Sequence, residues 1–323
     1  MDSNFLPFSP HRPHSVVMSL TSSGFIPSPR RIAVIAGATL TQLMRMKIFI
    51  FLLIFALAIL ALNTLRTSDF LGPETHGENE LTLIKNSAFG AMRLFGLVFC
   101  VTATSLLIPK DTEDRILYTI LCKPVPRIDY LAGKALGVLG LAVLSLAVMD
   151  LFSSGILWYR TGVIISEQTA ILASSGYTPE SMTPILDRIS AQGPVWNMQA
   201  GLLVMVMEFG VLTTVTLLLS CLTGGTIISS LLAFGVYFIG IFQNQAKIFW
   251  IESATSGISD TSLWISQALS ALFPNFGLYS ITDSAINGVS IPTTLLLQLA
   301  GISIAYMLFH TTLSAWIFHK KEF

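Results

Sequence analysis

Six apolar runs, each long enough to cross a lipid bilayer as a helix, constrain this chain more than any other feature of its sequence. A helix rises about 1.5 Å per residue, so about 20 apolar residues span the roughly 30 Å of hydrocarbon in a bilayer. The chain is 53% hydrophobic and 11% charged, which leaves more apolar surface than a soluble core of 323 residues can bury. We therefore predict an all-α, polytopic membrane protein. Its six predicted transmembrane helices cover residues 48–65, 87–108, 135–157, 200–222, 226–244 and 293–318.

The basic residues predict how these helices are oriented. Six crossings place both termini on one side, and Lys and Arg concentrate on the cytoplasmic side of membrane proteins. The side that carries both termini has twelve Lys and Arg residues, whereas the other side has five, against ten acids. We therefore predict cytoplasmic termini. Residues 223–225 alone separate the fourth and fifth helices, which must then form a tight antiparallel hairpin.

The N-terminal part divides in two. Residues 1–29 are rich in Pro, Ser and His and have no apolar block of the secretory type, so we predict a disordered cytoplasmic arm. Met18 is an alternative start to Met1. From residue 30 to 47, apolar residues recur at helical spacing beside four basic ones, which predicts an amphipathic helix along the inner membrane surface. Residues 30–323 then form a single transmembrane domain.

Two segments on the predicted outer side are too long to be simple connections. Residues 158–199 include Thr178, Pro179 and Glu180, an order typical of a helix start, and we expect a small external cap there. Residues 245–292 include about eleven residues of apolar helix that end at Pro274. This helix is too short to span a membrane, so we expect an interfacial or re-entrant piece.

The segment between the second and third predicted helices, residues 109–134, is called the hinge below. It begins with three acids and continues with an apolar helical face, and carboxylates complement the positive end of a helix. Pro124 and Pro126 then impose a stiff, extended break. The pattern indicates a short amphipathic helix presented in the cytoplasm. The alternative is an interfacial loop whose charges only anchor two helix ends.

The hinge resembles the cytoplasmic loop of type 2 ABC transporter permeases. The residues that carry the likeness are Glu113, Arg115, Thr119, Leu121, Lys123-Pro124-Val125, Arg127, Asp129-Tyr130-Leu131 and Gly133-Lys134. Three weaker likenesses are Ala38-Thr39-Leu40 before the first span, Phe273-Pro274-Asn275-Phe276 on the outer side, and the basic ending Phe318 to Phe323. The resemblance covers residues 30–323. Within the family, the chain is most similar to the permeases of gliding-motility and copper-maturation export systems.

This resemblance implies a six-helix permease of the inner (plasma) membrane, acting as an exporter. It implies a dimer with an identical or paralogous permease, in which each hinge forms a coupling helix that sits in a cleft of a separate ATPase subunit. The implied ATPase-coupling residues are Glu113, Arg115, Leu117, Leu121, Lys123, Pro124, Arg127, Asp129 and Tyr130. The chain has no GxxxxGK[ST] loop, so we expect ATP to bind to and be hydrolysed on the partner chain.

Three charged residues fall inside predicted spans, namely Arg93, Asp150 and Glu208. Each costs about 2.5 to 3.5 kcal/mol if it is left unpaired in the membrane. They lie about six to eight residues from the predicted outer ends of their helices, so Arg93 could pair with Glu208 or Asp150. We expect either an interhelical pair that fixes packing or a polar lining for a substrate path.

Other functions find less support in the sequence. The chain lacks HExxH, GxSxG and paired-Asp motifs, and its three Cys residues form no metal-binding cluster, so we expect no catalytic residue, metal or cofactor on this chain. We expect membrane lipid and protein partners and no nucleic acid. A membrane anchor or assembly factor for a soluble ATPase, which itself transports nothing, remains an alternative. The sequence does not identify the cargo.

Overall fold

The computed structural model describes residues 27–62, 78–113, 125–194, 196–254, 264, 273–281, 284, 286 and 291–320. Every element formed by these residues is helical, as predicted for an all-α chain. In chain order they are α1 (Pro29–Met44), α2 (Lys47–Leu62), α4 (Glu78–Glu113), α6 (Arg127–Ser174), α7 (Pro179–Ala191), α8 (Trp196–Thr223), α9 (Thr226–Ala254), the 3-10 helix η3 (Phe276–Ile281) and α12 (Thr293–Lys320).

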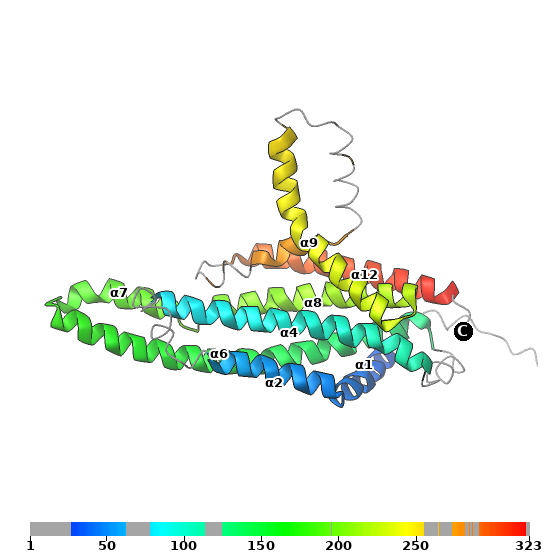
Figure 1. The fold of residues 1–323 in the computed structure, drawn as a ribbon, viewed down its shortest axis with the longest axis horizontal. Coiled ribbons are helices and arrows are strands. Elements are labelled where there is room, and N and C mark those ends of the chain that lie inside the picture. Colours follow the sequence, from blue (N-terminus) through cyan, green and yellow to red (C-terminus); the bar gives the residue numbers. More distant parts are fainter. Residues whose placement is uncertain are drawn as a thin grey trace, which may run out of the picture.

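The helices form an elongated bundle around α8 (Figure 1). α8 contacts α4, α6, α9 and α12, and every residue from 208 to 217 is buried. α1, the start of α6, the last turn of α4 and the end of α12 all lie at one end of this bundle, on the right in Figure 1. We call this the hinge end, because residues 109–113 and 125–134 of the hinge lie there.

Five helical stretches are long and apolar enough to cross a membrane. They are Asn79–Glu113, Arg127–Ser174, Pro179–Thr223, which includes both α7 and α8, Thr226–Gln243 and Thr293–Lys320. α1 and α2 together would add a sixth, although the chain bends by 70° between them. α2 alone has 16 residues, fewer than the roughly 20 that a spanning helix needs. The described residues therefore contain five or six candidate spans, compared with the six predicted from the sequence.

The predicted hairpin of the fourth and fifth spans is confirmed. α8 ends at Thr223 and α9 begins at Thr226, and Gly224 between them has a φ of +69°. Glycine adopts this left-handed conformation without the steric cost that other residues incur. The Gly224 amide donates a hydrogen bond to the carbonyl of Ser220, which completes the end of α8.

α6 is longer than the sequence predicted. The predicted span ends at residue 157, whereas the helix continues to Ser174 and has 48 residues. The chain turns at Gly176, whose φ is +81°, and α7 begins at Pro179 after the N-cap Thr178. The helix start at this position is therefore confirmed, but the expected small external cap is a long helical hairpin that packs back on α6.

α1 packs closely on the first turns of α6, because two glycines of α6 leave room for it. A Cβ atom added at Gly137 would lie 2.6 Å from Cβ of Thr39 and 2.8 Å from the carbonyl oxygen of Ala36. One added at Gly133 would lie 2.7 Å from Cβ of Ile35. The predicted amphipathic helix at 30–47 thus exists as α1, and one of its faces is held against α6.

The segment 245–292 is described only in part. α9 continues to Ala254, and its final part points away from the long axis of the bundle in Figure 1. The apolar helix expected before Pro274 lies outside the described residues. Beyond it, Phe276 is buried with its ring 5.1 Å from that of Tyr237, and a Cβ added at Gly240 would meet the carbonyl oxygen of Pro274 at 2.5 Å. This loop is therefore packed directly on α9.

Candidate functional site

The hinge end contains the described part of the predicted ATPase-coupling set. Glu113 is the last residue of α4 and is exposed, while Arg127, Asp129 and Tyr130 form the first turn of α6. The other five predicted residues, Arg115, Leu117, Leu121, Lys123 and Pro124, lie outside the described residues, as does the predicted coupling helix itself.

Asp129 is buried and contacts α1. Its Oδ2 atom accepts a hydrogen bond from Nε of Arg31 at 2.8 Å and one from the backbone amide of Ser28 at 3.3 Å. This carboxylate thus connects the start of α6 to the start of α1. Its side chain therefore faces the interior of the chain.

Tyr130 is also buried, and it meets a second carboxylate. Its hydroxyl donates a 2.5 Å hydrogen bond to Oδ2 of Asp111 on α4. Nζ of Lys134 lies 2.7 Å from the same Asp111 oxygen and donates to Oε1 of Gln42 at 3.4 Å. Asp111 therefore joins α4 to two residues of α6, and Gln42 extends the contact to α1.

Arg127 completes this arrangement by contacting the end of α12. Its guanidinium donates a hydrogen bond to the backbone carbonyl of Phe318 and lies 5.7 Å from the centre of the Phe318 ring. The Tyr130 ring lies 6.2 Å from the same ring. We call Asp111, Arg127, Asp129, Tyr130 and Lys134 the hinge network. It ties both sides of residues 114–124 to α1 and α12.

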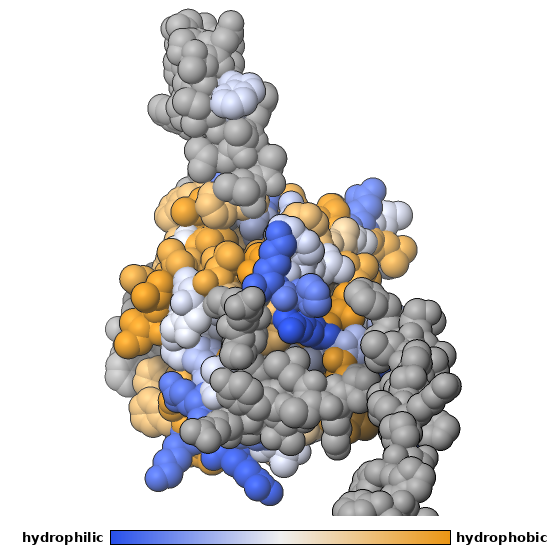
Figure 2. All heavy atoms as spheres, turned by 90° about the vertical axis from the view of Figure 1, so that its right-hand side faces the viewer, coloured by the Kyte–Doolittle hydropathy of each residue, from blue (hydrophilic) through white to orange (hydrophobic). Residues whose placement is uncertain are grey.

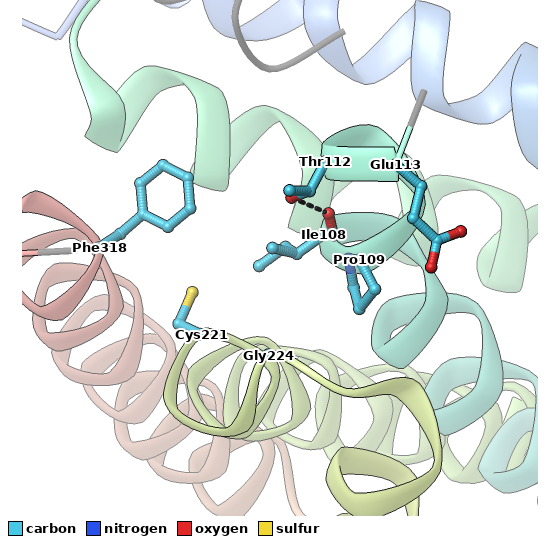
Figure 3. A pocket seen from close by; sticks show the side chains of 7 residues that line it. All are labelled: Ile108, Pro109, Thr112, Glu113, Cys221, Gly224 and Phe318. Carbon is cyan, nitrogen blue, oxygen red and sulfur yellow. Dashed lines mark hydrogen bonds between the residues drawn. The ribbon is translucent and has the colours of Figure 1, made fainter. Parts of the chain in front are cut away.

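A small cavity lies beside this network (Figure 3). Its volume is about 170 Å³, and it lies between the end of α4, the turn from α8 to α9 and the end of α12. Phe318 and the sulfur of Cys221 face it, whereas the carboxylate of Glu113 points away from Phe318. Its lining residues are Ile108, Pro109, Thr112, Glu113, Cys221, Gly224 and Phe318.

The end view of the molecule shows the polarity of the hinge end (Figure 2). Hydrophilic residues gather at the centre and lower edge of this face, and hydrophobic residues flank them. A hydrophilic end surrounded by hydrophobic sides is typical of a helix bundle whose sides contact lipid and whose end contacts water.

The charges predicted inside the membrane form two separate contacts. Nη2 of Arg93 on α4 lies 3.0 Å from Oε2 and 3.3 Å from Oε1 of Glu208 on α8. Tyr237 of α9 donates to Oε1 of Glu208 at 2.8 Å. Asp150 instead accepts a hydrogen bond from Nε2 of Gln199 at 2.9 Å. Of the two acids considered for Arg93, the structure thus pairs it with Glu208. This pair links α4 to α8, and Tyr237 adds α9 to the contact.

Two polar contacts at the opposite end escaped the sequence analysis. Arg160 of α6 pairs with Glu80 of α4, and Lys85 of α4 donates to the side chain of Gln192 beyond α7. All four side chains are buried. From the sequence, Glu80, Lys85 and Arg160 were expected on the aqueous outer side. Their position just outside apolar runs was the one sign that they could pair between helices.

The described residues also bear on metal binding and on the cysteines. Within these ranges, no three His, Cys, Asp or Glu side chains come together as they would around a metal ion. Cys100 and Cys221 are buried, and Cys122 lies outside the described residues. No protein-family model matches the chain, and no curated protein matches it at a significant level.

Proposed function

We propose that this chain is the membrane-spanning permease subunit of an ATP-binding cassette exporter. A separate ATPase subunit would dock on residues 114–124 and on the exposed Glu113. The permease would work in the inner (plasma) membrane as a pair, with a second copy or with a paralogue. The residues of the hinge that resemble those of type 2 ABC permeases are the starting point of this proposal.

The observation that supports it most is the hinge network. A loop that transmits force must be connected rigidly to the helices that move. Packed helices switch between discrete arrangements, and a loosely attached loop could not drive such a switch. Here Asp111 and Lys134 join the two helices that flank residues 114–124, and Asp129 and Arg127 join them to α1 and α12. Movement of the loop would therefore be transmitted to four helices together.

The network also divides the predicted coupling residues into two roles. Glu113 is exposed and can contact a partner, whereas Asp129 and Tyr130 are buried and act as positioning residues. Arg127 holds the carbonyl of Phe318, so reversing its charge would disturb the bundle itself. Arg115 and Lys123 are the better choice for a test of ATPase docking.

The first experiment is a mild-detergent pull-down of the tagged chain from its native membrane. The unmodified chain should recover an ATP-binding protein, and Arg115→Glu combined with Lys123→Glu should lose it. Arg66→Glu combined with Arg188→Glu makes the same change in charge on the predicted outer side and should retain it. Loss of the ATPase in both double variants, or its absence from the unmodified chain, would contradict the docking model.

The second experiment separates an exporter from an anchor. The complex recovered in the pull-down is reconstituted in liposomes, and its ATPase turnover is measured with extracts of the native membrane or its surroundings. A transporter should change its turnover when its substrate is present, because substrate must bind the access states unequally. A bound ATPase whose turnover never responds would favour a membrane anchor that transports nothing.

A further inference from the structure

A basic hollow lies at the hinge end, where α1, α2 and α4 meet. It has a volume of about 590 Å³ and is open to the surroundings. Six residues line it, namely Ala38, Thr41, Gln42, Arg45, Met46 and Lys110. They come from the end of α1, the bend before α2 and the last turn of α4.

Arg45 and Lys110 have no partner of opposite charge in the described part of the chain. By contrast, Arg31, Arg93, Lys134 and Arg160 each pair with a carboxylate. Two like charges that line one hollow repel each other and raise the local positive potential. An anion placed between them would remove this repulsion.

The surrounding groups also suit an anion. α2 begins at Lys47, directly after the lining residue Met46, so the positive end of its helix dipole lies beside the hollow. The carboxyl ends of α1 and α4 lie there as well, and Arg45 and Lys110 offset the negative ends of these two dipoles. The first amide groups of a helix bind phosphate and carboxylate well. Gln42 adds a side-chain amide donor, since its Oε1 atom is already used by Lys134.

The adjoining surface indicates that this anion belongs to a lipid. Immediately after Lys47, α2 exposes large apolar side chains: Ile48 is 57% exposed, Phe51 68% and Phe55 49%. An exposed apolar helix that starts beside two neighbouring cations is typical of the boundary between lipid headgroups and hydrocarbon. A soluble anion would use the cations alone, whereas a lipid would use both surfaces.

We propose that this hollow binds the phosphate of an anionic membrane lipid, whose acyl chains lie along α2. Occupancy would reach the hinge network by two routes. Gln42 lines the hollow and accepts from Lys134, and Lys110 precedes Asp111 in the same turn of α4. The lipid would thereby hold α1, α2 and α4 together at the point where the hinge begins. This inference does not depend on transport or on an ATPase.

Binding can be tested on the purified full chain in a neutral detergent. Short-chain phosphatidylglycerol is titrated while retained lipid is counted by native mass spectrometry and Tm is recorded. The unmodified chain should retain the lipid and gain in Tm. Arg45→Gln combined with Lys110→Gln should bind at least about tenfold more weakly, because each cation near a phosphate contributes to affinity. Ala38→Glu, which places an acid in the hollow, should weaken binding in the same way.

Matched controls decide between sources of the anion. Arg30→Gln combined with Lys320→Gln removes the same charge from the same end outside the hollow, and should bind like the unmodified chain. Phosphatidylcholine, which has no net charge, and inorganic phosphate should each raise Tm less than phosphatidylglycerol. If inorganic phosphate raised Tm as much as phosphatidylglycerol does, the hollow would bind a soluble anion and not a lipid. If the control variant lost as much lipid affinity as the Arg45 and Lys110 variant, general surface charge would explain the binding. Either result would overturn the proposal.

Discussion

Nζ of Lys134 lies 2.7 Å from Oδ2 of Asp111, and this buried ion pair joins α6 to α4 across the hinge. Tyr130 donates to the same carboxylate oxygen. A buried pair adds little net stability, but removal of one partner leaves a charge without compensation. The pair therefore makes the separation of α4 and α6 at the hinge costly, and this cost can be measured.

Lys134→Met should lower the free energy of unfolding by about 3 to 5 kcal/mol, because Asp111 would remain buried without its ammonium partner. Thermal unfolding of the purified chain in detergent measures this effect. Lys110→Met, one residue from Asp111, removes a cation without a described partner and should change Tm little when the detergent contains no anionic lipid. Asp111→Leu combined with Lys134→Met should recover part of the loss. An equal decrease of Tm in the Lys134 and Lys110 variants would show that the ion pair of Asp111 and Lys134 contributes no more than Lys110 does.

Arg93→Leu should destabilise the bundle more than Glu208→Leu. The Glu208 side chain is fully buried, whereas 29% of the Arg93 side chain is exposed and can reach polar surroundings when its partner is lost. Tyr237→Phe, which removes one hydrogen bond to Glu208, should cost about 1.5 to 3 kcal/mol. Comparison of the three Tm values tests this order. A larger loss for Glu208→Leu than for Arg93→Leu would contradict it.

Gly137→Ala should weaken the packing of α1 on α6, because the added Cβ meets the backbone oxygen of Ala36 at 2.8 Å. Overpacking of this kind typically costs about 1 to 3 kcal/mol. Gly140→Ala is the matched control on the same helix, since its Cβ would make an ordinary 3.6 Å contact with Leu40. The rate at which a protease cuts within α1 should rise in the first variant and not in the second. Equal rates would mean that α1 is not held by this contact.

Gly240→Ala should displace the loop that precedes η3, because the new Cβ would lie 2.5 Å from the carbonyl oxygen of Pro274. Gly235→Ala on the same helix meets nothing within 4 Å and should be neutral or stabilising by up to about 1 kcal/mol. Accessibility of a single cysteine introduced at Ser280 reports the loop position. Unchanged labelling in both variants would show that the position of the loop does not depend on the close contact between Gly240 and Pro274.

Hydropathy predicted which stretches form long apolar helices better than it predicted where these helices end. α12 and the turn between α8 and α9 match the sequence closely, because long apolar runs and Gly224 specify them locally, whereas α9 continues past its predicted end at residue 244 to Ala254. α6 continues 17 residues beyond the predicted end at residue 157, from residue 158 to Ser174. Arg160 can remain in this helix because it pairs with Glu80, which is distant in the sequence and could not be assigned as its partner.

The hinge residues show a second limit of sequence reasoning. Asp129 and Tyr130 are polar residues in a charged segment, and a pattern alone cannot tell whether such side chains face outward or inward. Their partners Arg31 and Asp111 belong to other helices, and only the fold brings them together. The Arg93 and Glu208 pair was easier to anticipate, because an isolated charge in an apolar span has few ways to be compensated.

The unbroken length of α6 has a mechanical consequence. Its 48 residues correspond to a rod of about 72 Å, more than twice the roughly 30 Å of hydrocarbon in a bilayer. The hinge network holds one end of this rod, and the turn at Gly176 lies at the other. A tilt of roughly 10° about the hinge would move the far tip by about 12 Å, given this length. Any rotation of α6 about the hinge end would therefore be amplified at the tip formed by α6 and α7, and a fluorescent label at this tip would report it.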